Sequence, residues 1–459
     1  MVSGSDVMKK KKKRLKKKNI FFFIMIILIG ALGVSFVIKK DNLFSSKVKI
    51  TYDNTVNSDN KYSVKISYDD NIDNLKCSLD NKEFKNISEC NFELELGKYT
   101  VYIKNDSLFI KKDFEVKSNY EGTFTSVIDM LDTYYLASNG KKAFKFTFDY
   151  PKDFDTKVTY VIDDPSLLKV ENDTMIALKT GETKVTAKLK DGNSKTYNVV
   201  VTDLIVSPVI NTNKAFLPCG RYTKEENELL DKILASRVKE AGEGTRAGVA
   251  AAARFITLEF PYTIKYFNEN GRMGTSVANG VDAEGRYYHK GLYLNKYKFS
   301  ELTGKSTVTG PATWGCNLHD AFLSDLYGSY LMRPNGFTCS GFVTWAMLNG
   351  GFDVGDVGAG DRIEVKNELS DLGTHIPLTY EFMKTGDYQV GDFIARDGHA
   401  ALIIGFDDKN IYTAESLPPK LKVYIYERWT GVVNDPNLTY TIDMTGIYPN
   451  GEGVIENMW

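Results

Sequence analysis

Histidine and cysteine are scarce in this sequence, whose 459 residues include four histidines and five cysteines. It contains no H-E-x-x-H or C-x-x-C spacing and no Gly-rich phosphate loop, so neither a metal centre nor a nucleotide site is implied. We therefore expect no cofactor. Apolar residues make up 42% of the chain and aromatic residues 12%, which is enough to build packed cores.

Net charge is also nearly absent, at −1, but the charges are unevenly distributed. Residues 1–40 carry eleven Lys or Arg and one acid, nine of the basic residues in the run KKKKKRLKKK at 9–18. Taking these from the totals of 58 and 59 leaves 47 basic and 58 acidic residues in 41–459, a net charge of −11. The two parts of the chain therefore face different surroundings.

An uncharged apolar run, IFFFIMIILIGALGVSFVI at 20–38, follows the basic block. At about 1.5 Å per residue this run spans roughly 28 Å as a helix, close to the thickness of a bilayer core. We expect a single-pass membrane anchor with residues 1–19 cytoplasmic and the rest extracellular. A cleaved signal peptide is the alternative, but its apolar region is usually shorter. The basic block alone would also fit nucleic acid, but beside this run we expect none bound.

The five cysteines suit an exported chain, because disulfides persist outside the reducing cytoplasm. Two disulfides and one unpaired cysteine would account for the odd number, and an odd cysteine is a candidate reactive thiol. One sequence does not prove the connectivity. Cys77 and Cys90 lie close together in a strand-rich stretch, where closing the loop would stabilise the fold by about 3 kcal/mol, so we expect this pair.

Short alternating segments bounded by Asn, Asp, Ser or Gly predict two β-sandwich domains, over 47–117 and 120–203. The stretch TMIALKTGETKVTAKLKDG resembles bacterial group 2 Ig-like domains, which implies a spacer or an adhesion module. The first domain is only generically Ig-like. Neither contains a cluster of titratable residues, so we expect both to form a stalk.

Helical patterns begin after about Leu204. Thr223 and Glu226 have the spacing of a capping box and predict the start of a helix over 223–240. A second helix is predicted over 247–260, with small residues on a face that can pack closely. A tyrosine- and glycine-rich region follows to about 335. We expect 205–310 to be an accessory part of the C-terminal domain.

The sequence GFTCSGFVTWAMLNGG, residues 336–351, predicts a helix with Cys339 in its first turn. Apolar residues recur on one helical face, Gly350–Gly351 offers a stop and Gly336 permits a tight turn into the helix. A helix N-terminus favours the thiolate, which is the reactive form of cysteine. Alone, these residues slightly favour an inert buried cysteine.

A histidine changes that balance. In QVGDFIARDGHAALIIGF, residues 389–406, a hairpin turn precedes His399 at the start of a buried strand. An imidazole beside a thiol can take its proton and later protonate a leaving amine. The next strand, NIYTAES at 410–416, offers Thr413, Glu415 or Ser416 to orient the imidazole, and we favour Glu415 although a solvated acid is the alternative. The other histidines, His289, His319 and His375, have no partner motif and are interpreted as structural or surface residues.

GFTCSGFVTWA and VGDFIARDGHAALIIG, about sixty residues apart, resemble the NlpC (NlpC/p-sixty) family of papain-like cysteine peptidases. The resemblance covers roughly 311–416. It implies an α+β papain-like core, which we place at 311–459, with Cys339 as nucleophile, His399 as base and a third polar residue from the next strand. The substrates it implies are peptidoglycan stem peptides, most often the bond between γ-D-glutamate and a diamino acid.

The sequence departs from the family pattern at several positions. Thr338 replaces the usual Asp before the cysteine, and the third residue is not the common His. In PATWGC, residues 311–316, Ala312 replaces a tyrosine whose hydroxyl often lines the oxyanion site, and one lost donor can lower the rate about 10²–10³-fold. Cys316 replaces a glycine, which favours a disulfide with Cys219.

Substrate contacts are expected from three residues. Trp314 lies in PATWGC and Ser340 in GFTCSGFVTWA, and Arg246 suits bidentate binding of a wall-peptide carboxylate. Arg272 and Arg286 have the same potential, although an ordinary surface ion pair is the simpler interpretation for any one arginine.

The preferred hypothesis is a membrane-anchored extracellular cysteine hydrolase of peptidoglycan, with two Ig-like domains between the anchor and a C-terminal α+β domain. The alternative is a catalytically impaired wall-binding or adhesion protein, favoured by the Ig-like domains and by the changes at Thr338 and Ala312. A third possibility is a transferase, because an amine can intercept a thioester.

Overall fold

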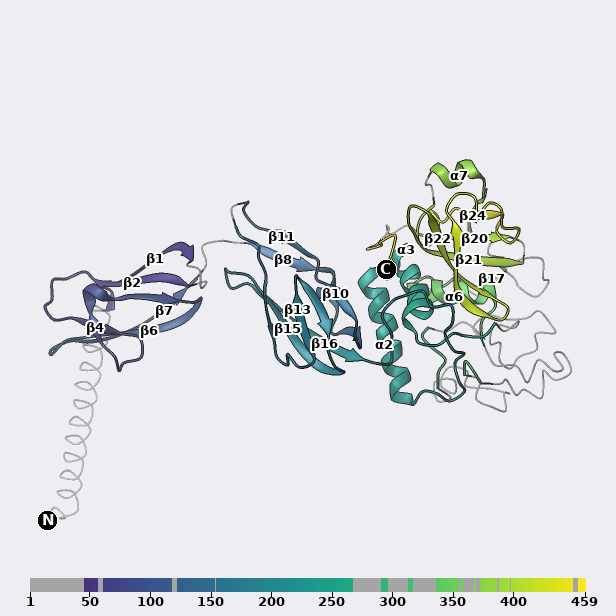
Figure 1. Cartoon of the computed structure of the whole chain (residues 1–459). Coiled ribbons are helices and arrows are strands. Elements are labelled where there is room, and N and C mark those ends of the chain that lie inside the picture. Colours follow the sequence, from purple (N-terminus) through teal and green to yellow (C-terminus); the bar gives the residue numbers. More distant parts are fainter. Residues whose placement is uncertain are drawn as a thin grey trace, which may run out of the picture. The chain divides into compact units, whose positions relative to one another are not determined.

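The fold is that of a computed structural model of the chain (Figure 1). It describes residues 45–56, 61–117, 122–152, 154–266, 290–295, 313–316, 336–354, 357–358, 367–368, 372–385, 388–396, 398–448 and 453–459. The predicted anchor at 20–38 lies outside these residues. Within them, no helix has both the length and the apolar character needed to cross a membrane.

The first group of strands forms a β-sandwich. Its two antiparallel sheets have the orders β1-β2-β5 and β4-β3-β6-β7. Alternate residues point inward, so that Val64 and Ile66 of one sheet and Val101 and Ile103 of the other are buried in one apolar core. The strands are β1 (Val48–Val56), β2 (Tyr62–Tyr68), β3 (Lys76–Ser78), β4 (Lys85–Asn86), β5 (Asn91–Leu94), β6 (Gly97–Lys104) and β7 (Phe109–Val116), with the 3-10 helix η1 (Ile87–Glu89) between β4 and β5.

A second group of strands follows, with the sheet orders β12-β15-β16-β9, β10-β14-β13 and β11-β8. In β15 and β16 every second residue is buried, which is the alternation that the sequence predicts. The elements are β8 (Thr123–Ser126), η2 (Val127–Met130), β9 (Tyr134–Ala137), β10 (Lys141–Ala143), β11 (Phe146–Asp149), β12 (Thr159–Ile162), β13 (Leu168–Glu171), β14 (Thr174–Ala177), β15 (Gly181–Lys188) and β16 (Ser194–Thr202).

The chain divides into two compact units, and the boundary passes through this second group of strands. Segments 148–158 and 188–194 belong to the first unit, whereas Phe124–Thr147, Thr159–Ala187 and Lys195–Trp459 belong to the second. Within the second unit, Ala137 of β9 and Ile205 lie in the same apolar cluster as the helices that follow. Most of the second group of strands is therefore part of the C-terminal unit and not a separate stalk.

Two helices open the C-terminal region. The capping box confirms the predicted start of α2 (Lys224–Ala241), because Thr223 N donates to Glu226 and Glu226 N donates to Thr223 Oγ1, at 2.8 and 3.1 Å. The second helix, α3 (Arg246–Arg254), continues as one π-helical turn, η3 (Phe255–Glu259). Its small residues allow the close packing that was predicted: a Cβ on Gly248 would lie 3.1 Å from the Gly350 carbonyl of α6.

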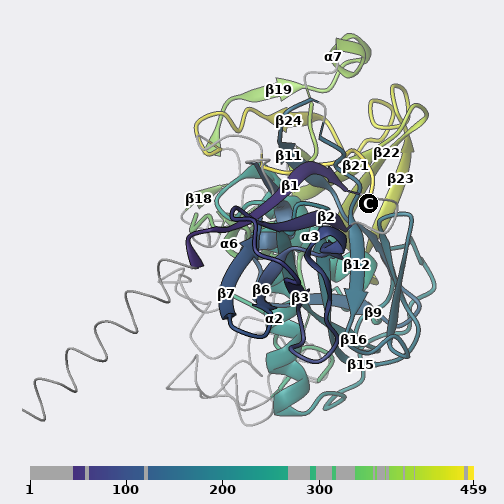
Figure 2. The ribbon, with the colours of Figure 1, turned by 90° about the vertical axis from the view of Figure 1, so that its left-hand side faces the viewer.

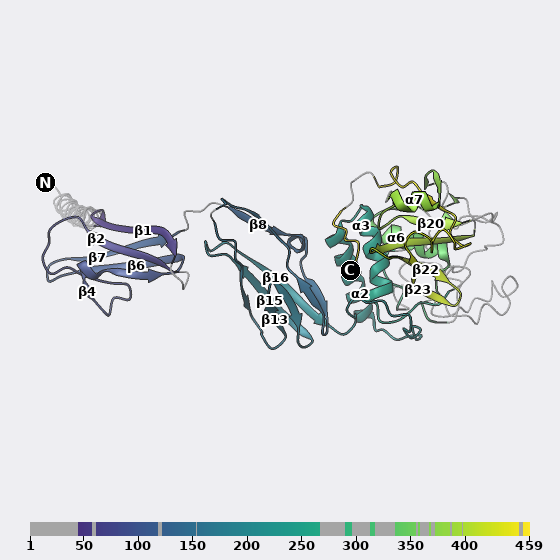
Figure 3. The ribbon, with the colours of Figure 1, turned by 45° about the horizontal axis from the view of Figure 1, so that its top comes forward.

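The helix α6 (Cys339–Gly350) packs against α3 and against strands β21 and β22. Figure 3 shows α6 together with α3 and β22. Every residue from Gly341 to Gly350 is buried. This differs from the predicted single apolar face, because a sheet covers one side of the helix and α3 and an aromatic layer cover the others. The helix ends as predicted, at Gly351, whose φ of 106° is left-handed.

A six-stranded sheet of order β19-β24-β20-β21-β22-β23 forms the rest of this region. Leu402 and Ile404 face the helices, whereas Ala401 and Ile403 face a second cluster with Met383. Figure 2 shows β22 and β23 side by side at one edge of the sheet. The elements are β17 (Val357–Gly358), β18 (Asn367–Glu368), β19 (His375–Pro377), α7 (Tyr380–Thr385), β20 (Phe393–Arg396), β21 (His399–Phe406), β22 (Asn410–Leu417), β23 (Lys420–Glu427) and β24 (Tyr440–Ile442).

Candidate active site

Cys339 is the first residue of α6. Thr338 caps the helix, because its Oγ1 accepts a hydrogen bond from Gly341 N at 3.0 Å. The Cys339 thiol is 8% exposed, and its Sγ lies 3.9 Å from the Gly398 carbonyl in the turn before His399. Thr and Asp both cap helices well, so Thr338 supplies the cap that an Asp would give here without placing a negative charge beside the thiol.

The glycine that precedes the helix has a different role from the one predicted. A Cβ on Gly336 would lie 1.8 Å from the carbonyl oxygen of Lys265, so the absence of a side chain allows two backbones to approach. Phe337 N donates to the same carbonyl at 3.1 Å, and the Phe337 carbonyl accepts from Ser416 Oγ at 2.9 Å. The segment that presents Cys339 is therefore fixed from two sides.

His399 begins β21, directly after the tight turn that joins it to β20. The two strands are antiparallel, and Arg396 is the register partner of His399. The imidazole is 1% exposed. Its Nε2 lies 2.9 Å from Glu415 Oε2 on β22. Nδ1 is buried and has no hydrogen-bond partner among the described residues. Cys339 lies close enough to the ring to raise the pKa of His399.

Glu415 is completely buried and accepts hydrogen bonds at both carboxylate oxygens. Besides the contact with His399, its Oε1 accepts from the Thr413 hydroxyl and from the Tyr426 hydroxyl, the latter at 2.9 Å. The alternatives considered from the sequence are thereby separated: Thr413 contacts Glu415, and Ser416 contacts the backbone before α6. Of the three, Glu415 is the residue that contacts the imidazole.

The electrostatics of this cluster favour an ion pair between thiolate and imidazolium. Burial raises the pKa of the Cys339 thiol, but the His399 imidazole and the backbone N–H groups of Ala400 and Ser340 outweigh it and bring the pKa below its ordinary value. Burial lowers the pKa of His399, whereas Cys339 and Glu415 raise it, with a net result of about 9. Both shifts favour a charged, nucleophilic sulfur.

Two predicted substrate-binding residues lie near Cys339 in other roles. Trp314 is 4% exposed and packs in an aromatic layer, with ring centroids 4.6 Å from Phe337 and 5.9 Å from Trp345. It therefore supports the start of α6 and exposes little of its surface, and the predicted substrate contact stays a prediction. Ser340 is partly exposed, and its backbone N–H faces the thiol.

Arg246 also differs from the prediction. Its guanidinium pairs with Asp392 in the Gly-Asp turn before β20 and lies 5.1 Å from the centroid of the Tyr448 ring. The side chains of Arg246 and Asp392 are 11% and 10% exposed. This buried ion pair joins α3 to the turn before β20, and it accounts for the arginine without a substrate carboxylate.

The structure pairs four of the five cysteines and leaves Cys339 free. Cys77 and Cys90 form one disulfide, and Cys219 and Cys316 form the other, with Cα atoms 6.2 and 4.3 Å apart. The second disulfide lies two residues after Trp314, so it fixes the segment that carries the aromatic layer.

Several residues singled out from the sequence fall outside the described ranges: Arg272, Arg286, His289, Ala312 and His319. His375 is described and exposed, and its ring stacks on Tyr440 at 4.1 Å. The described residues contain no group of three or more His, Cys, Asp or Glu side chains that could hold a metal ion.

Sequence reasoning missed Tyr426, which contacts Glu415. The signal was the alternation in KLKVYIYE at 420–427, which places Lys420, Lys422, Tyr424 and Tyr426 on one face of β23. The pattern identifies the face but not the reach of the phenol. In register, Lys422 and not Tyr426 lies opposite Glu415.

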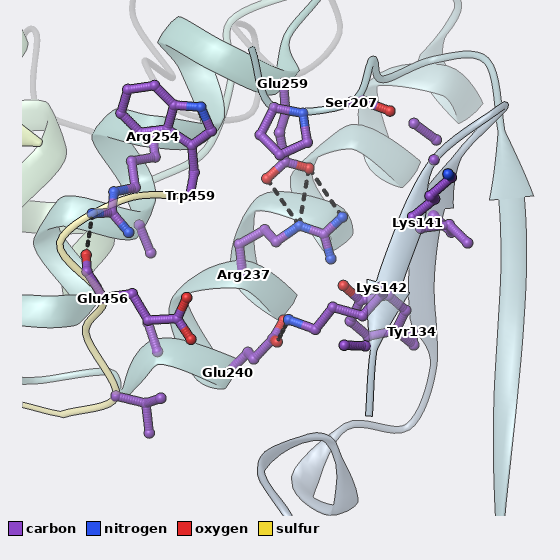
Figure 4. A pocket seen from close by; sticks show the side chains of 18 of the residues that line it. Tyr134, Lys141, Lys142, Ser207, Arg237, Glu240, Arg254, Glu259, Glu456 and Trp459 are labelled. Atoms are coloured by element: carbon purple, nitrogen blue, oxygen red, sulfur yellow. Dashed lines mark hydrogen bonds and ion pairs between the residues drawn. The ribbon is translucent and has the colours of Figure 1, made fainter. Parts of the chain in front are cut away.

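A cavity of about 440 Å³ lies elsewhere in the C-terminal unit, and neither Cys339 nor His399 lines it (Figure 4). Strands β9 and β10, helices α2 and α3 and the segment 453–459 surround it. The charged side chains that line it form ion pairs with one another: Arg237 contacts Glu259, and Lys142 contacts Glu240. The Lys142–Glu240 pair connects β10 to α2, and we assign no ligand to the cavity.

No family model matches the sequence, and no curated protein matches it. Similar solved structures include the S-layer protein rSbsC(31-844), at 16% identity and a TM-score of 0.17, with 36% of this chain and 29% of that chain covered. A C-terminal fragment of intimin in complex with the intimin-binding domain of its translocated receptor has 16% identity and a TM-score of 0.18, covering 41% and 78%. Fibronectin(III)-like modules of Clostridium thermocellum CbhA have 11% identity and a TM-score of 0.15, covering 34% and 94%.

This chain thus spans less than a third of the S-layer chain. Scores this low carry no argument about architecture or function, and the assignment of a β-sandwich rests on the strands and the core given above.

Proposed function

We propose that this protein is a cysteine hydrolase of the NlpC type that cleaves amide bonds in peptidoglycan stem peptides. The observation that carries the proposal is the placement of His399, whose Nε2 contacts the buried Glu415 while its charge acts on the Cys339 thiol. A nucleophile, a base and a group that orients the base are the three parts that such chemistry needs. The packing of α6 on β21 and β22 supports the papain-like arrangement implied by the two motifs.

In the proposed reaction, the Cys339 thiolate attacks the carbonyl carbon of the scissile amide. The tetrahedral intermediate collapses as the C–N bond breaks, and the His399 imidazolium gives its proton to the leaving amine. The thioester is then hydrolysed by a water molecule that loses one proton to the neutral imidazole, which regenerates the ion pair and releases a carboxylic acid that gives its proton to the solvent. Glu415 keeps the imidazole oriented through both steps and stabilises its charged form.

The substrate and location follow from the sequence resemblance and from the apolar run. The bond between γ-D-glutamate and a diamino acid is the first candidate. The anchor at 20–38 would keep the enzyme at the outer face of the membrane, with the first β-sandwich following the anchor along the chain and preceding the C-terminal unit.

Incubation of the full chain with purified peptidoglycan, in mild detergent because of the predicted anchor, tests this function. We expect new amino termini to appear with the wild type and with His375→Ala, whose ring stacks on Tyr440, but not with Cys339→Ala. Mass spectrometry of the released fragments would identify the bond. Equal release by the wild type and Cys339→Ala would refute the proposal, and binding to peptidoglycan without release would favour the wall-binding alternative.

A further inference from the structure

The carboxylate of Glu415, which contacts His399, accepts a hydrogen bond from the neighbouring strand β23. Strand β23 carries none of the residues proposed to act in catalysis. Tyr426 lies on β23, the edge strand of the sheet, and its hydroxyl donates to Glu415 Oε1 at 2.9 Å. The Thr413 hydroxyl donates to the same oxygen. The opposite oxygen, Oε2, is thereby directed at His399 Nε2.

We propose that Tyr426 is a positioning residue that, together with Thr413, orients the Glu415 carboxylate and through it the imidazole of His399. The inference deepens the proposed function and rests on it, since it assumes that Cys339 and His399 act together. Tyr426 touches neither the thiol nor the imidazole, so its influence passes through Glu415.

The contacts of Glu415 leave the carboxylate dependent on these hydroxyls. Among the described residues, its only ion pair is with His399. Lys422 is its register partner on β23, but the ammonium lies 4.2 Å from the centroid of the Tyr424 ring. A buried carboxylate whose one cationic neighbour contacts a single oxygen needs hydrogen-bond donors at the other oxygen, because burial removes its hydration.

Tyr426 is suited to donate. Burial and the charge of Glu415 raise the pKa of Tyr426 well above its ordinary value, so the phenol keeps its proton at any pH at which the protein works. Asp435 and Tyr424 also raise the pKa of Tyr426. Neither is hydrogen-bonded to Glu415 among the described residues.

The chain provides a matched control. Tyr424 lies two residues earlier on the same face of β23, stacks on Tyr426 with centroids 6.4 Å apart, and is likewise half-buried. Its contribution near Glu415 is packing and charge, without a hydrogen bond to the carboxylate. Substitution of Tyr424 by Phe therefore removes a hydroxyl from the same surface without removing a donor to Glu415.

The experiment measures the rate of iodoacetamide alkylation of Cys339 in the full chain as a function of pH. In Tyr426→Phe we expect the rate at pH 7 to fall about tenfold, because a hydrogen bond to a charged group is lost. The pH midpoint of alkylation should rise, since a less well held imidazolium lowers the thiol pKa less. Tyr424→Phe should stay within about twofold of the wild type, since it removes no such bond.

The threonine provides a second pair of variants. Thr413→Val should raise the midpoint in the same direction, and Thr413→Ser, which keeps the hydroxyl, should restore it. At a pH where the thiol is fully ionised in all variants, their rates should converge, whereas a variant with damaged packing would stay slow. An unchanged midpoint in Tyr426→Phe, or an equal change in Tyr424→Phe, would overturn the inference.

The assay is independent of wall hydrolysis. If peptidoglycan is not cleaved but the midpoint still depends on Tyr426, the proposed function fails and the positioning role stands. If hydrolysis is observed and the midpoint is insensitive to Tyr426, the proposed function stands and the positioning role of Tyr426 fails.

Discussion

The first β-sandwich buries none of its described charged side chains, whereas the C-terminal region buries several of them. In the described part of 45–117, Ser78 is the one polar residue that is buried, and ion pairs such as Lys49–Asp69 are exposed. The C-terminal region buries Glu259, Asp392, His399 and Glu415. Because charge is costly to remove from water unless it is paired and hydrogen-bonded, each of these groups requires an explanation.

These four buried groups fall into two classes. Glu259 and Asp392 form ion pairs with Arg237 and Arg246 that join elements of the fold, and the free thiol of the described residues belongs to neither pair. Even so, burial raises the pKa of Asp392 to about 6, against the effect of Arg246. His399–Glu415 differs because the partner of the carboxylate is a titratable imidazole beside a free thiol. A perturbed pKa therefore marks a candidate site only when the neighbouring groups can react.

The largest expected effect is that of removing His399, the titratable residue that distinguishes the His399–Glu415 pair from the two arginine–carboxylate pairs. In His399→Ala the thiol loses the imidazole that lowers its pKa, and we expect alkylation of Cys339 at neutral pH to slow by about 10²–10³-fold. Wall hydrolysis should disappear with it. His375→Ala is the matched control, because His375 is exposed and stacks on Tyr440. Equal alkylation rates in the two variants would mean that Cys339 is an ordinary buried thiol.

The pH dependence should separate the two chemical roles of His399. Its pKa is raised to about 9, so the imidazolium is present below that pH and is lost as the pH rises through it. Hydrolysis needs this proton for the leaving amine and should fall about tenfold per pH unit above about 9, whereas alkylation needs only the thiolate and should persist. On the acid side both should fall as the thiolate is protonated, below the ordinary pKa of cysteine. Parallel loss of both reactions above pH 9 would contradict this assignment.

Local patterns predicted the elements that carry the candidate site. The capping box at Thr223, the helix that starts at Cys339 and the strand that starts at His399 are each determined by neighbours in the chain. The choice of Glu415 from three polar residues also agrees with the contact in the structure, since alternation along β22 places it on one face with Thr413.

Tertiary packing determined what the sequence could not. Arg246 looked available for a substrate, but its partner Asp392 lies 146 residues away along the chain. Gly336 looked like a turn residue, and its role depends on the backbone of Lys265. Tyr426 reaches Glu415 diagonally across the face of the sheet, a contact that depends on side-chain direction beyond strand register.

Breaking a buried ion pair should lower the free energy of unfolding more than breaking an exposed one. Arg237→Ala leaves Glu259 buried without its bidentate partner and removes the bond to the Tyr135 carbonyl, so we expect a loss of about 3 to 5 kcal/mol. Calorimetry of the full chain should show the loss in the transition of the C-terminal unit. Lys49→Ala, which breaks an exposed pair in the first sandwich, should change neither transition measurably. Equal effects would show that burial does not set the strength of these pairs.

The Cys77–Cys90 disulfide tests the independence of the first sandwich from the site. The two cysteines are separated by 13 positions, and in the chain-entropy model a loop of that size contributes about 3 kcal/mol by restricting the unfolded chain. Replacing both with alanine should lower the unfolding temperature of the first unit and leave the alkylation rate of Cys339 unchanged, because the core around the disulfide shares no residue with the cluster that holds α6. A slower alkylation in this variant would show that the stability of the first sandwich affects the reactivity of Cys339. The two would then not be independent.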